Sequence, residues 1–486
     1  MMLMFLLMDP PFNPEFDLSG RDVSSCTIDE EVTMAKQGNT ILVAYISEEY
    51  NANVLMMSFD GGNSWSSIGY GPSYTDCWVG DPAVAIQPDN PNKIYFAGIE
   101  YCQGSGGQND VRGEVWFCTC SAGAGCSSAS NWSCTYVGQN DYWTYFKDKE
   151  WLLPLGGSTV LVNFTSNMYG DNNLFVYKTT DDGATWNGIG YLNFISTVGY
   201  WAKDGNTIYM SFNDFSNVES NYEIGAGFLY STDGGNSFNL GGEVFFSIAG
   251  SQSTACPHDA RPAKIHDHIT ASSGKVAIAF TDDYCLVNVA TWQGTTPLGV
   301  QQVSPDMGGT EQILPMLASY GNYIYLMYQG RIGDYGYCGS SPVGEWATGW
   351  LFSPDWGNTW SQPYRVSSRN YGFRENPSGH DYLGWFIDDG ILYAAWGNDF
   401  FDEDGGHVLF AYSNPVELAE FSQGKIPFAV FIMPGGIMIN SREQVEIFSA
   451  SGRLIRSMPP GEAFVPLKSG IYILHSGSYS KKVIVQ

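Results

Sequence analysis

Basic residues are scarce in this chain. It contains 22 Lys and Arg against 50 Asp and Glu over 486 residues, which gives a formal net charge of −28. An acidic surface repels phosphates and offers few cations to replace their counterions, so we expect no nucleic-acid partner. Carboxylates are ligands of hard cations, which makes Ca²⁺ a candidate ligand, although solubility outside the cell explains the acidity as well.

The chain also lacks an apolar run long enough to cross a bilayer, so we expect no transmembrane segment. The first eight residues, Met1–Met8, are apolar but too short. They have no basic start and no small-residue cleavage site, so residues 1–8 are interpreted as the remnant of a longer leader.

Common catalytic signatures are missing too. The sequence contains no HExxH and no GxSxG motif, and the Gly-rich stretch Gly104–Gly107 is not followed by Lys-Ser or Lys-Thr. These absences argue against a zinc protease, an α/β-hydrolase and a P-loop protein.

Cysteines, by contrast, are present in an even number, ten. Four of them lie close together in the sequence: Cys118, Cys120, Cys126 and Cys134. Their spacing lacks the CxxC pairs of common zinc sites, so disulfides are favoured over a metal cluster. Disulfides persist in oxidising compartments, and we therefore expect an extracellular or outer-surface protein.

The composition is typical of strands and turns, with 44 % hydrophobic residues, 57 Gly and 30 Tyr. A motif of the form Ser/Thr-x-Asp-x-Gly-x-Ser/Thr-aromatic occurs four times, each time after an apolar run. Its Asp can accept backbone N–H bonds across a turn, and its Gly can take a positive φ. The aromatic ring is expected to pack back between sheets. The Asp and aromatic residues are Asp60 and Trp65, Asp181 and Trp186, Asp233 and Phe238, and Asp355 and Trp360.

This motif resembles the Asp-box, or BNR repeat, of sialidases and other β-propellers. Two of the three intervals between its aspartates are about twice the third, which indicates a period of about 60 residues with two degenerate copies. A second strand recurs in phase, at Thr40–Tyr45, Lys93–Ala97, Thr159–Phe164, Thr207–Phe212, Lys275–Phe280, Tyr323–Tyr328 and Gly390–Trp396. We therefore predict an all-β fold over residues 9–415, a seven-bladed β-propeller of four-stranded antiparallel blades, with six blades as the alternative. The ring would close through an N-terminal strand near Phe16–Val23 or through the chain after Asn414.

After Pro415 the pattern changes. Residues 416–486 lose the motif and contain a strand that ends in a Gly452-Arg453 turn, a Gly470-Ile-Tyr472 strand and a final Lys-rich strand from Lys481. This order resembles the C-terminal sorting domain of type IX secretion cargo. The resemblance implies a small β-sandwich that is recognised by the type IX secretion machinery; an unrelated small β-sandwich appendage is the alternative.

In a propeller the innermost strand of each blade lines a central channel, and ligands bind at its mouth. The stretches before the second strands carry acids and aromatics at a similar phase. They are Asp29, Glu30, Glu31, Asp76, Asp81, Asp148, Glu150, Tyr200, Trp201, His258, Asp259, Arg261, Glu311, His380, Asp381 and Tyr382. Such a ring suits a sugar, which stacks on aromatic rings and bonds carboxylates through its hydroxyls, and it suits a cation equally. Alternatively, the acids bond backbone N–H groups of neighbouring inner strands and only tie the blades together.

The resemblance to sialidases implies residues that this sequence lacks. That family holds its substrate carboxylate with three arginines, the first in a Phe/Tyr-Arg-Ile-Pro motif before the first Asp-box. The equivalent stretch, Val32–Lys36, has no Arg, and of the arginines before residue 415 only Arg261 has a good inner-strand position. Sialic acid hydrolysis is therefore disfavoured.

Hydrolysis of another glycan needs only a pair of carboxylates. Asp259 with Asp381, and Asp81 with Glu150, are candidate pairs. His258 and His380 each adjoin an Asp that would orient the imidazole as a base, and a simple surface hydrogen bond is the alternative for each.

Two functional hypotheses follow. The first is a secreted propeller that binds or cleaves an extracellular polysaccharide at the channel mouth. The second is a non-catalytic adhesion or surface protein that contacts other surface proteins, recruits Ca²⁺ or self-assembles. We favour a binding or structural role over catalysis, because the one family site that the sequence can test is missing; whether the chain is an enzyme stays open.

Overall fold

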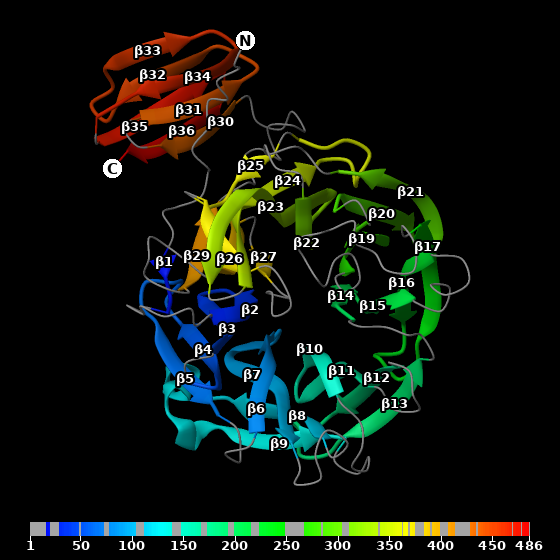
Figure 1. The fold of residues 1–486 in the computed structure, drawn as a ribbon. Coiled ribbons are helices and arrows are strands. Elements are labelled where there is room, and N and C mark those ends of the chain that lie inside the picture. Colours follow the sequence, from blue (N-terminus) through cyan, green and yellow to red (C-terminus); the bar gives the residue numbers. More distant parts are fainter. Residues whose placement is uncertain are drawn as a thin grey trace.

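Strands make up nearly all regular structure in the computed structural model (Figure 1). The structure describes residues 16–19, 29–47, 50–71, 77–103, 111–138, 147–166, 173–192, 199–214, 223–247, 267–282, 285–303, 311–338, 341–361, 363–367, 370–374, 383–388, 391–398, 407–413, 428–433, 436–468, 470–477 and 479–485. Within these ranges the helical segments are two short 3₁₀ turns, η1 (Gly123–Ser127) and η2 (Ala129–Asn131). The predicted all-β class is confirmed.

The described strands between residues 16 and 413 form seven antiparallel sheets, which we number in chain order. Sheet 1 contains β2 (Asp29–Gln37), β3 (Thr40–Ser47), β4 (Ala52–Ser58) and β5 (Ser66–Tyr70). Sheet 2 contains β6 (Cys77–Gln87), β7 (Asn90–Gln103), β8 (Val111–Cys120) and β9 (Ser133–Val137). Sheet 3 contains β10 (Lys147–Gly156), β11 (Thr159–Ser166), β12 (Asn173–Thr179) and β13 (Asn187–Leu192).

Sheets 4 and 5 repeat the same order, whereas sheet 6 has a fifth strand and sheet 7 includes the N-terminal strand. Sheet 4 contains β14 (Trp201–Asp204), β15 (Thr207–Asp214), β16 (Glu223–Ser231) and β17 (Asn239–Ser247). Sheet 5 contains β18 (His268–Ser272), β19 (Lys275–Thr281), β20 (Val287–Gln293) and β21 (Thr296–Gln302). Sheet 6 contains β22 (Glu311–Tyr320), β23 (Tyr323–Cys338), β24 (Ser341–Ser353), β25 (Tyr364–Arg365) and β26 (Tyr371–Arg374). Sheet 7 contains β27 (Gly384–Asp388), β28 (Ile391–Asn398), β29 (His407–Ser413) and β1 (Phe16–Asp17).

The sheets stand around a common centre, with the first strand of each sheet on the inside (Figure 1). The second strands are the recurring apolar runs of the sequence, and β3, β7, β11, β15, β19, β23 and β28 are found where they were predicted. β3 is almost wholly buried along its length, because a strand in the middle of a blade is covered on both faces by neighbouring sheets. The arrangement is a β-propeller.

Sheet 7 is completed by the N-terminal strand. β1 pairs antiparallel with β29, with Phe16 opposite Phe410 and Asp17 opposite Leu409. Asp17 also accepts a hydrogen bond through Oδ2 from Nδ1 of His407 at 2.8 Å. The first of the two predicted ways to close the ring is therefore the one that the chain uses.

The four Ser/Thr-x-Asp-x-Gly turns share one hydrogen-bond pattern. In the turn after β16, Oδ1 of Asp233 accepts bonds from the Ser231 hydroxyl at 2.7 Å and from the Ser237 amide at 3.0 Å. Oδ2 of Asp233 accepts from the Ser237 hydroxyl at 2.6 Å, and the Ser231 hydroxyl accepts from the Gly235 amide at 2.9 Å. The Asp233 carboxylate thus accepts hydrogen bonds from groups of its own turn. Its side chain is exposed to solvent and does not point into the channel.

Two of these turns also pack against the preceding sheet. A Cβ placed on Gly235 of sheet 4 would lie 2.6 Å from Leu161 of sheet 3, and one placed on Gly183 of sheet 3 would lie 2.7 Å from Phe117 of sheet 2. Trp186 packs edge-on against the same Phe117 ring at 5.1 Å. At Gly183 and Gly235 the glycine of the motif is therefore required for close approach between blades as well as for its positive φ.

Disulfides fasten sheet 2. Cys118 pairs with Cys134 across β8 and β9, and Cys120 pairs with Cys126 in the loop that contains η1. A third disulfide joins Cys77 and Cys102 across β6 and β7. The preference for disulfides over a metal at the clustered cysteines is confirmed.

The chain after residue 427 forms two further sheets. One contains β30 (Phe428–Met433), β31 (Gly436–Ser441) and β34 (Gly461–Pro466). The other contains β32 (Val445–Ser449), β33 (Leu454–Met458), β35 (Gly470–Ser476) and β36 (Tyr479–Val485). Their buried apolar residues form a core cluster drawn only from this part of the chain. The boundary predicted at residue 415 lies outside the described residues and stays a prediction.

Candidate functional site

A cavity of about 590 Å³ lies at the centre of the ring, lined by residues of the inner strands. Every one of the seven sheets contributes, through β2, β6, β10, β14 with the preceding Tyr200, β18, β22 and β27. Because residues from seven separated stretches of the chain meet there, the cavity exists only when the ring is closed. It is the natural place for a ligand in this fold.

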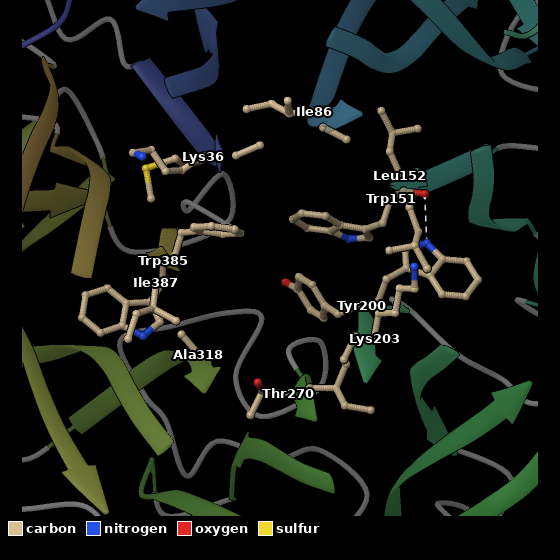
Figure 2. Close-up of a pocket in the computed structure, with 18 of the residues that line it drawn as sticks. Lys36, Ile86, Trp151, Leu152, Tyr200, Lys203, Thr270, Ala318, Trp385 and Ile387 are labelled. Atoms are coloured by element: carbon tan, nitrogen blue, oxygen red, sulfur yellow. Dashed lines mark hydrogen bonds between the residues drawn. The ribbon is translucent and has the colours of Figure 1, made fainter. Parts of the chain in front are cut away.

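Aromatic rings form one wall of this cavity. The rings of Trp151 and Tyr200 project toward its middle (Figure 2). Their centroids are 4.5 Å apart with a tilt of 43°, and the His268 ring follows at 4.6 Å from Tyr200. The Leu317 amide donates to Nδ1 of His268 at 3.0 Å, so that nitrogen carries no proton. Consecutive sheets 3, 4, 5 and 6 are thereby linked along one continuous wall.

Hydrogen bonds hold this wall in place. The indole N–H of Trp201 donates to the backbone oxygen of Trp151 at 3.2 Å, which joins sheet 4 to sheet 3 (Figure 2). Trp151 is partly buried, and Tyr200 is almost fully buried. The part of the Trp151 ring that stays accessible is backed by Tyr200, and a ring fixed in this way can bind a flat apolar face without losing much side-chain entropy.

Charged groups lie at the end of the cavity where the inner strands finish. The Lys36 ammonium contacts Oδ2 of Asp388 at 2.8 Å, a pair that joins sheet 1 to sheet 7. Lys203 also lines the cavity and is exposed. This end of the cavity therefore combines an apolar wall with a polar rim, which is the usual composition of a small-ligand site.

The inner strands also share a distortion near their N-terminal ends. β2, β6, β10 and β22 each contain a register shift, between Glu30 and Thr33, Gly80 and Ala83, Asp148 and Trp151, and Ile313 and Met316. One residue in each bulge has a positive φ: Glu31, Asp81, Lys149 and Leu314. Non-glycine residues rarely adopt this conformation, and such strain is commonly found at functional sites.

In sheets 1 to 3 these bulges bring three charged side chains together. The Lys149 ammonium lies 2.7 Å from Oδ1 of Asp81 and 3.4 Å from Oε1 of Glu31. Glu31 also accepts the Asp81 amide through Oε2 at 3.1 Å. All three residues are buried. Glu31 thus accepts a hydrogen bond from a backbone N–H of the neighbouring inner strand. This is the blade-tying role predicted from the sequence as the alternative to a ligand-binding ring of acids.

Glu150, next to Lys149, has the opposite electrostatic character to Asp81. Burial raises the pKa of Glu150 well above its ordinary value, and the nearby Asp81 carboxylate adds to the effect. Burial would also raise the pKa of Asp81, but the Lys149 ammonium and side-chain hydrogen bonds with Asp148, Lys149 and Glu31 together outweigh it and hold that pKa well below its ordinary value. Glu150 has a side chain without a hydrogen-bond partner among the described residues. One buried cluster thus contains a carboxylate that stays ionised and a carboxyl that tends to stay protonated.

The predicted site residues do not all meet in one place. The structure brings Asp81 and Glu150 together in the buried cluster, and it places Tyr200 and Trp201 at the cavity. Glu311 begins β22 and lies opposite Arg331 of β23. Seven further predicted residues lie outside the described residues: Asp76, His258, Asp259, Arg261, His380, Asp381 and Tyr382.

Sequence reasoning missed two of the residues that matter most. Lys149 was overlooked because no lysine was considered among the inner-strand candidates, although it stands between Asp148 and Glu150. Trp151 was overlooked because it follows the acids by one residue. A search for a lone cation among inner-strand acids would have found the first.

One group of described residues has the composition of a metal site, namely Cys77, Glu100 and Cys102. The two thiols are joined in a disulfide, which removes them as thiolate ligands. No helix in the described part of the chain is long and apolar enough to span a membrane.

Comparison with known proteins adds a likeness of fold. No protein-family model and no curated protein matches this chain. Among solved structures, the polysaccharide lyase Uly1 is 11 % identical, with 79 % of this chain and 89 % of that chain covered and a TM-score of 0.44. A sialidase from Trypanosoma rangeli is 8 % identical, covers 94 % and 84 %, and has a TM-score of 0.38. A GH93 α-L-arabinofuranosidase from Fusarium graminearum is 13 % identical, covers 56 % and 94 %, and has a TM-score of 0.34. Scores this low carry no argument about function, and the propeller fold rests on the sheets of this chain.

Proposed function

We propose that this chain is a seven-bladed Asp-box β-propeller that binds an extracellular glycan in its central cavity. The observation that carries the proposal is the fixed aromatic wall of Trp151, Tyr200 and His268 along a cavity of about 590 Å³. A pyranose ring offers an apolar C–H face to such a wall and hydroxyls to the polar rim. The strong net negative charge favours a neutral sugar over an anionic one.

The propeller details support this proposal in two ways. Seven described sheets follow one strand order, and the four turns share the hydrogen bonds that an Asp-box motif predicts. Neither feature supplies chemistry. They support a rigid scaffold in which the ligand site is the cavity.

Export to the cell surface is part of the same proposal. The disulfides described in sheet 2 fit an oxidising compartment, and the C-terminal strands follow the order expected of a type IX sorting domain. Adhesion to surface proteins and self-assembly remain alternatives within this proposal. Ca²⁺ is retained as a candidate ligand.

A screen on immobilised neutral polysaccharides tests the binding proposal. Wild type should be retained by at least one polymer, and Trp151→Ala should lose retention while Trp151→Phe keeps most of it. Phe245→Ala is the matched control, because Phe245 is an exposed aromatic on the outer strand β17 and away from the cavity. Equal retention of Trp151→Ala and wild type would contradict the proposal.

A second candidate function is glycoside hydrolysis, which the opposite pKa shifts of Asp81 and Glu150 favour. An ionised carboxylate beside a protonated carboxyl is the pair that such chemistry requires, with Glu150 as the acid and Asp81 as the base or nucleophile. Reducing-sugar release on the same polymers separates the two functions. Release that disappears in Glu150→Gln supports catalysis, whereas binding without release by wild type rejects it.

A further inference from the structure

A group of aromatic side chains lies at the other end of the inner strands from the cavity. Trp78 is the second residue of β6, whereas the cavity begins at Val84 of the same strand. Tyr101 of β7 is the direct cross-strand partner of Trp78. Tyr50 follows β3, whose last residue, Ser47, pairs with the first residue of β2. All three aromatics therefore belong to the end where the inner strands begin.

These rings are unusually open to solvent. Tyr50 is 64 % exposed and Trp78 is 49 % exposed, which places them among the most exposed large hydrophobic residues of the described chain. The Trp78 and Tyr101 rings are stacked, with centroids 5.8 Å apart and an angle of 23° between their planes. Tyr101 supports the Trp78 ring, and much of the indole surface stays free for a ligand.

Covalent and hydrogen bonds hold the group rigid. The residue pair next to Trp78 and Tyr101 is the disulfide Cys77–Cys102, which ties the ends of β6 and β7 together. The Asn51 side-chain amide donates to the Cys77 backbone oxygen at 3.1 Å. This bond joins sheet 1 to sheet 2 between the neighbours of Tyr50 and Trp78. A surface fixed in this way loses little entropy when a ligand binds.

The charge of the chain decides which flat ligand suits these rings. Nucleic-acid bases stack on aromatics, but their phosphates would meet a molecule of net charge −28. Anionic sugars meet the same repulsion. A neutral pyranose has an apolar face of suitable size and no charge, and Tyr and Trp combine a flat apolar body with a polar group that can reach sugar hydroxyls.

We infer that Tyr50, Trp78 and Tyr101 form an aromatic platform that binds neutral hexose units of a polysaccharide. The platform shares its class of ligand with the proposed function but not its site. A long polymer would contact both ends of the inner strands, whereas a short oligosaccharide would occupy them separately. Two independent sites raise the avidity for a polymer above that for an oligomer.

Calorimetric titration with cellohexaose and laminarihexaose tests the platform. Trp78→Ala should weaken one of the two binding events about ten-fold, the loss expected for one aromatic stacking contact, and Trp78→Phe should restore most of it. Phe245→Ala is the matched control, because its side chain is 47 % exposed and lies on the outer strand of sheet 4. Thermal unfolding of each variant checks that the fold is kept.

The variants separate this inference from the channel proposal. If Trp151→Ala abolishes all hexose binding and Trp78→Ala changes none of it, the platform is rejected and the channel site stands. If Trp78→Ala alone loses binding, the platform stands and the channel proposal fails. Titration of a proline decamer tests a peptide as the occupant, and binding of that peptide but of neither hexasaccharide would overturn the inference.

Discussion

Lys149 and Asp81 occupy the same bulge position on neighbouring inner strands, and the Lys149 ammonium lies 2.7 Å from the Asp81 carboxylate. Both residues have a positive φ, and both are buried. Glu31 occupies the same bulge position in sheet 1, and its carboxylate forms the second ion pair with the Lys149 ammonium. The repeated bulge therefore places one cation between two carboxylates and ties sheets 1, 2 and 3 together.

Replacing Lys149 with Met should destabilise the protein strongly. The change leaves the carboxylates of Asp81 and Glu31 buried without their cation, and breaking a buried ion pair in this way costs about 3–5 kcal/mol. Urea denaturation followed by tryptophan fluorescence measures the loss. The added change Asp81→Asn should recover part of it, because it removes one of the unpaired charges.

Lys203→Met is the matched control for that experiment. Lys203 is an exposed lysine on an inner strand, so its replacement should change the unfolding free energy by no more than about 0.5 kcal/mol. A Lys149→Met protein as stable as the control would show that the three-sheet contact contributes nothing to the fold.

The stability of the protein should depend on pH through Glu243. Burial raises the pKa of Glu243 from 4.5 to about 7, and the neighbouring Asp214 carboxylate adds to the shift. Because the pKa is higher in the folded state, folding favours the protonated form, and this contribution to stability is lost as the pH rises from about 4.5 through 7. The effect is measured as the difference between the unfolding free energies of Glu243→Gln and wild type at each pH across this range. The difference should grow in favour of the variant as the pH rises.

Asp214→Asn supplies the control for this pH dependence. It removes the second cause of the shift, so the pKa of Glu243 should fall and the pH-dependent difference should shrink without vanishing. Parallel pH profiles for wild type and Glu243→Gln would exclude a raised pKa at this residue.

Two adjacent glycines in the turn after β16 allow the effect of a positive φ to be measured apart from the effect of close packing against sheet 3. Gly234 and Gly235 have φ values of 72° and 78°, but a Cβ on Gly234 meets nothing within 4 Å, whereas one on Gly235 lies 2.6 Å from Leu161. Alanine at either position should cost about 1–2 kcal/mol for its positive φ. Gly235→Ala should lose more, because it also presses on sheet 3. Equal melting temperatures for the two variants would show that a side chain at position 235 does not clash with sheet 3. In a Leu161→Ala background the difference in melting temperature between the two variants should become smaller.

Much of this fold follows from local patterns in the sequence. The apolar runs and the four turns depend on residue types that are adjacent in the chain, so their prediction needed no knowledge of long-range contacts. Closure of the ring pairs Phe16–Asp17 with β29 at the other end of the propeller, and the sequence left two routes open for it. The order of short strands after residue 444 was predicted for the same reason.

The site was harder to predict because its members meet only through the closed ring. The Lys149–Asp81 contact joins residues 68 positions apart, and no local pattern shows which acid faces which base. The bulges escaped notice because each is a single extra residue with a different side chain in every repeat. In the sequence Trp151 cannot be distinguished from other aromatic residues of strands, because its contact with Tyr200, and through Tyr200 with His268, forms only in the folded ring.

The most direct test of the account is a calorimetric titration of wild type, Trp151→Ala and Trp151→Phe with an oligosaccharide released from a polymer that retains the protein. We expect Trp151→Ala to bind about ten-fold more weakly or not at all, and Trp151→Phe to stay close to wild type, because the aromatic wall supplies the contact with the sugar face. Unchanged affinity in Trp151→Ala, with its melting temperature preserved, would contradict glycan binding in the central cavity.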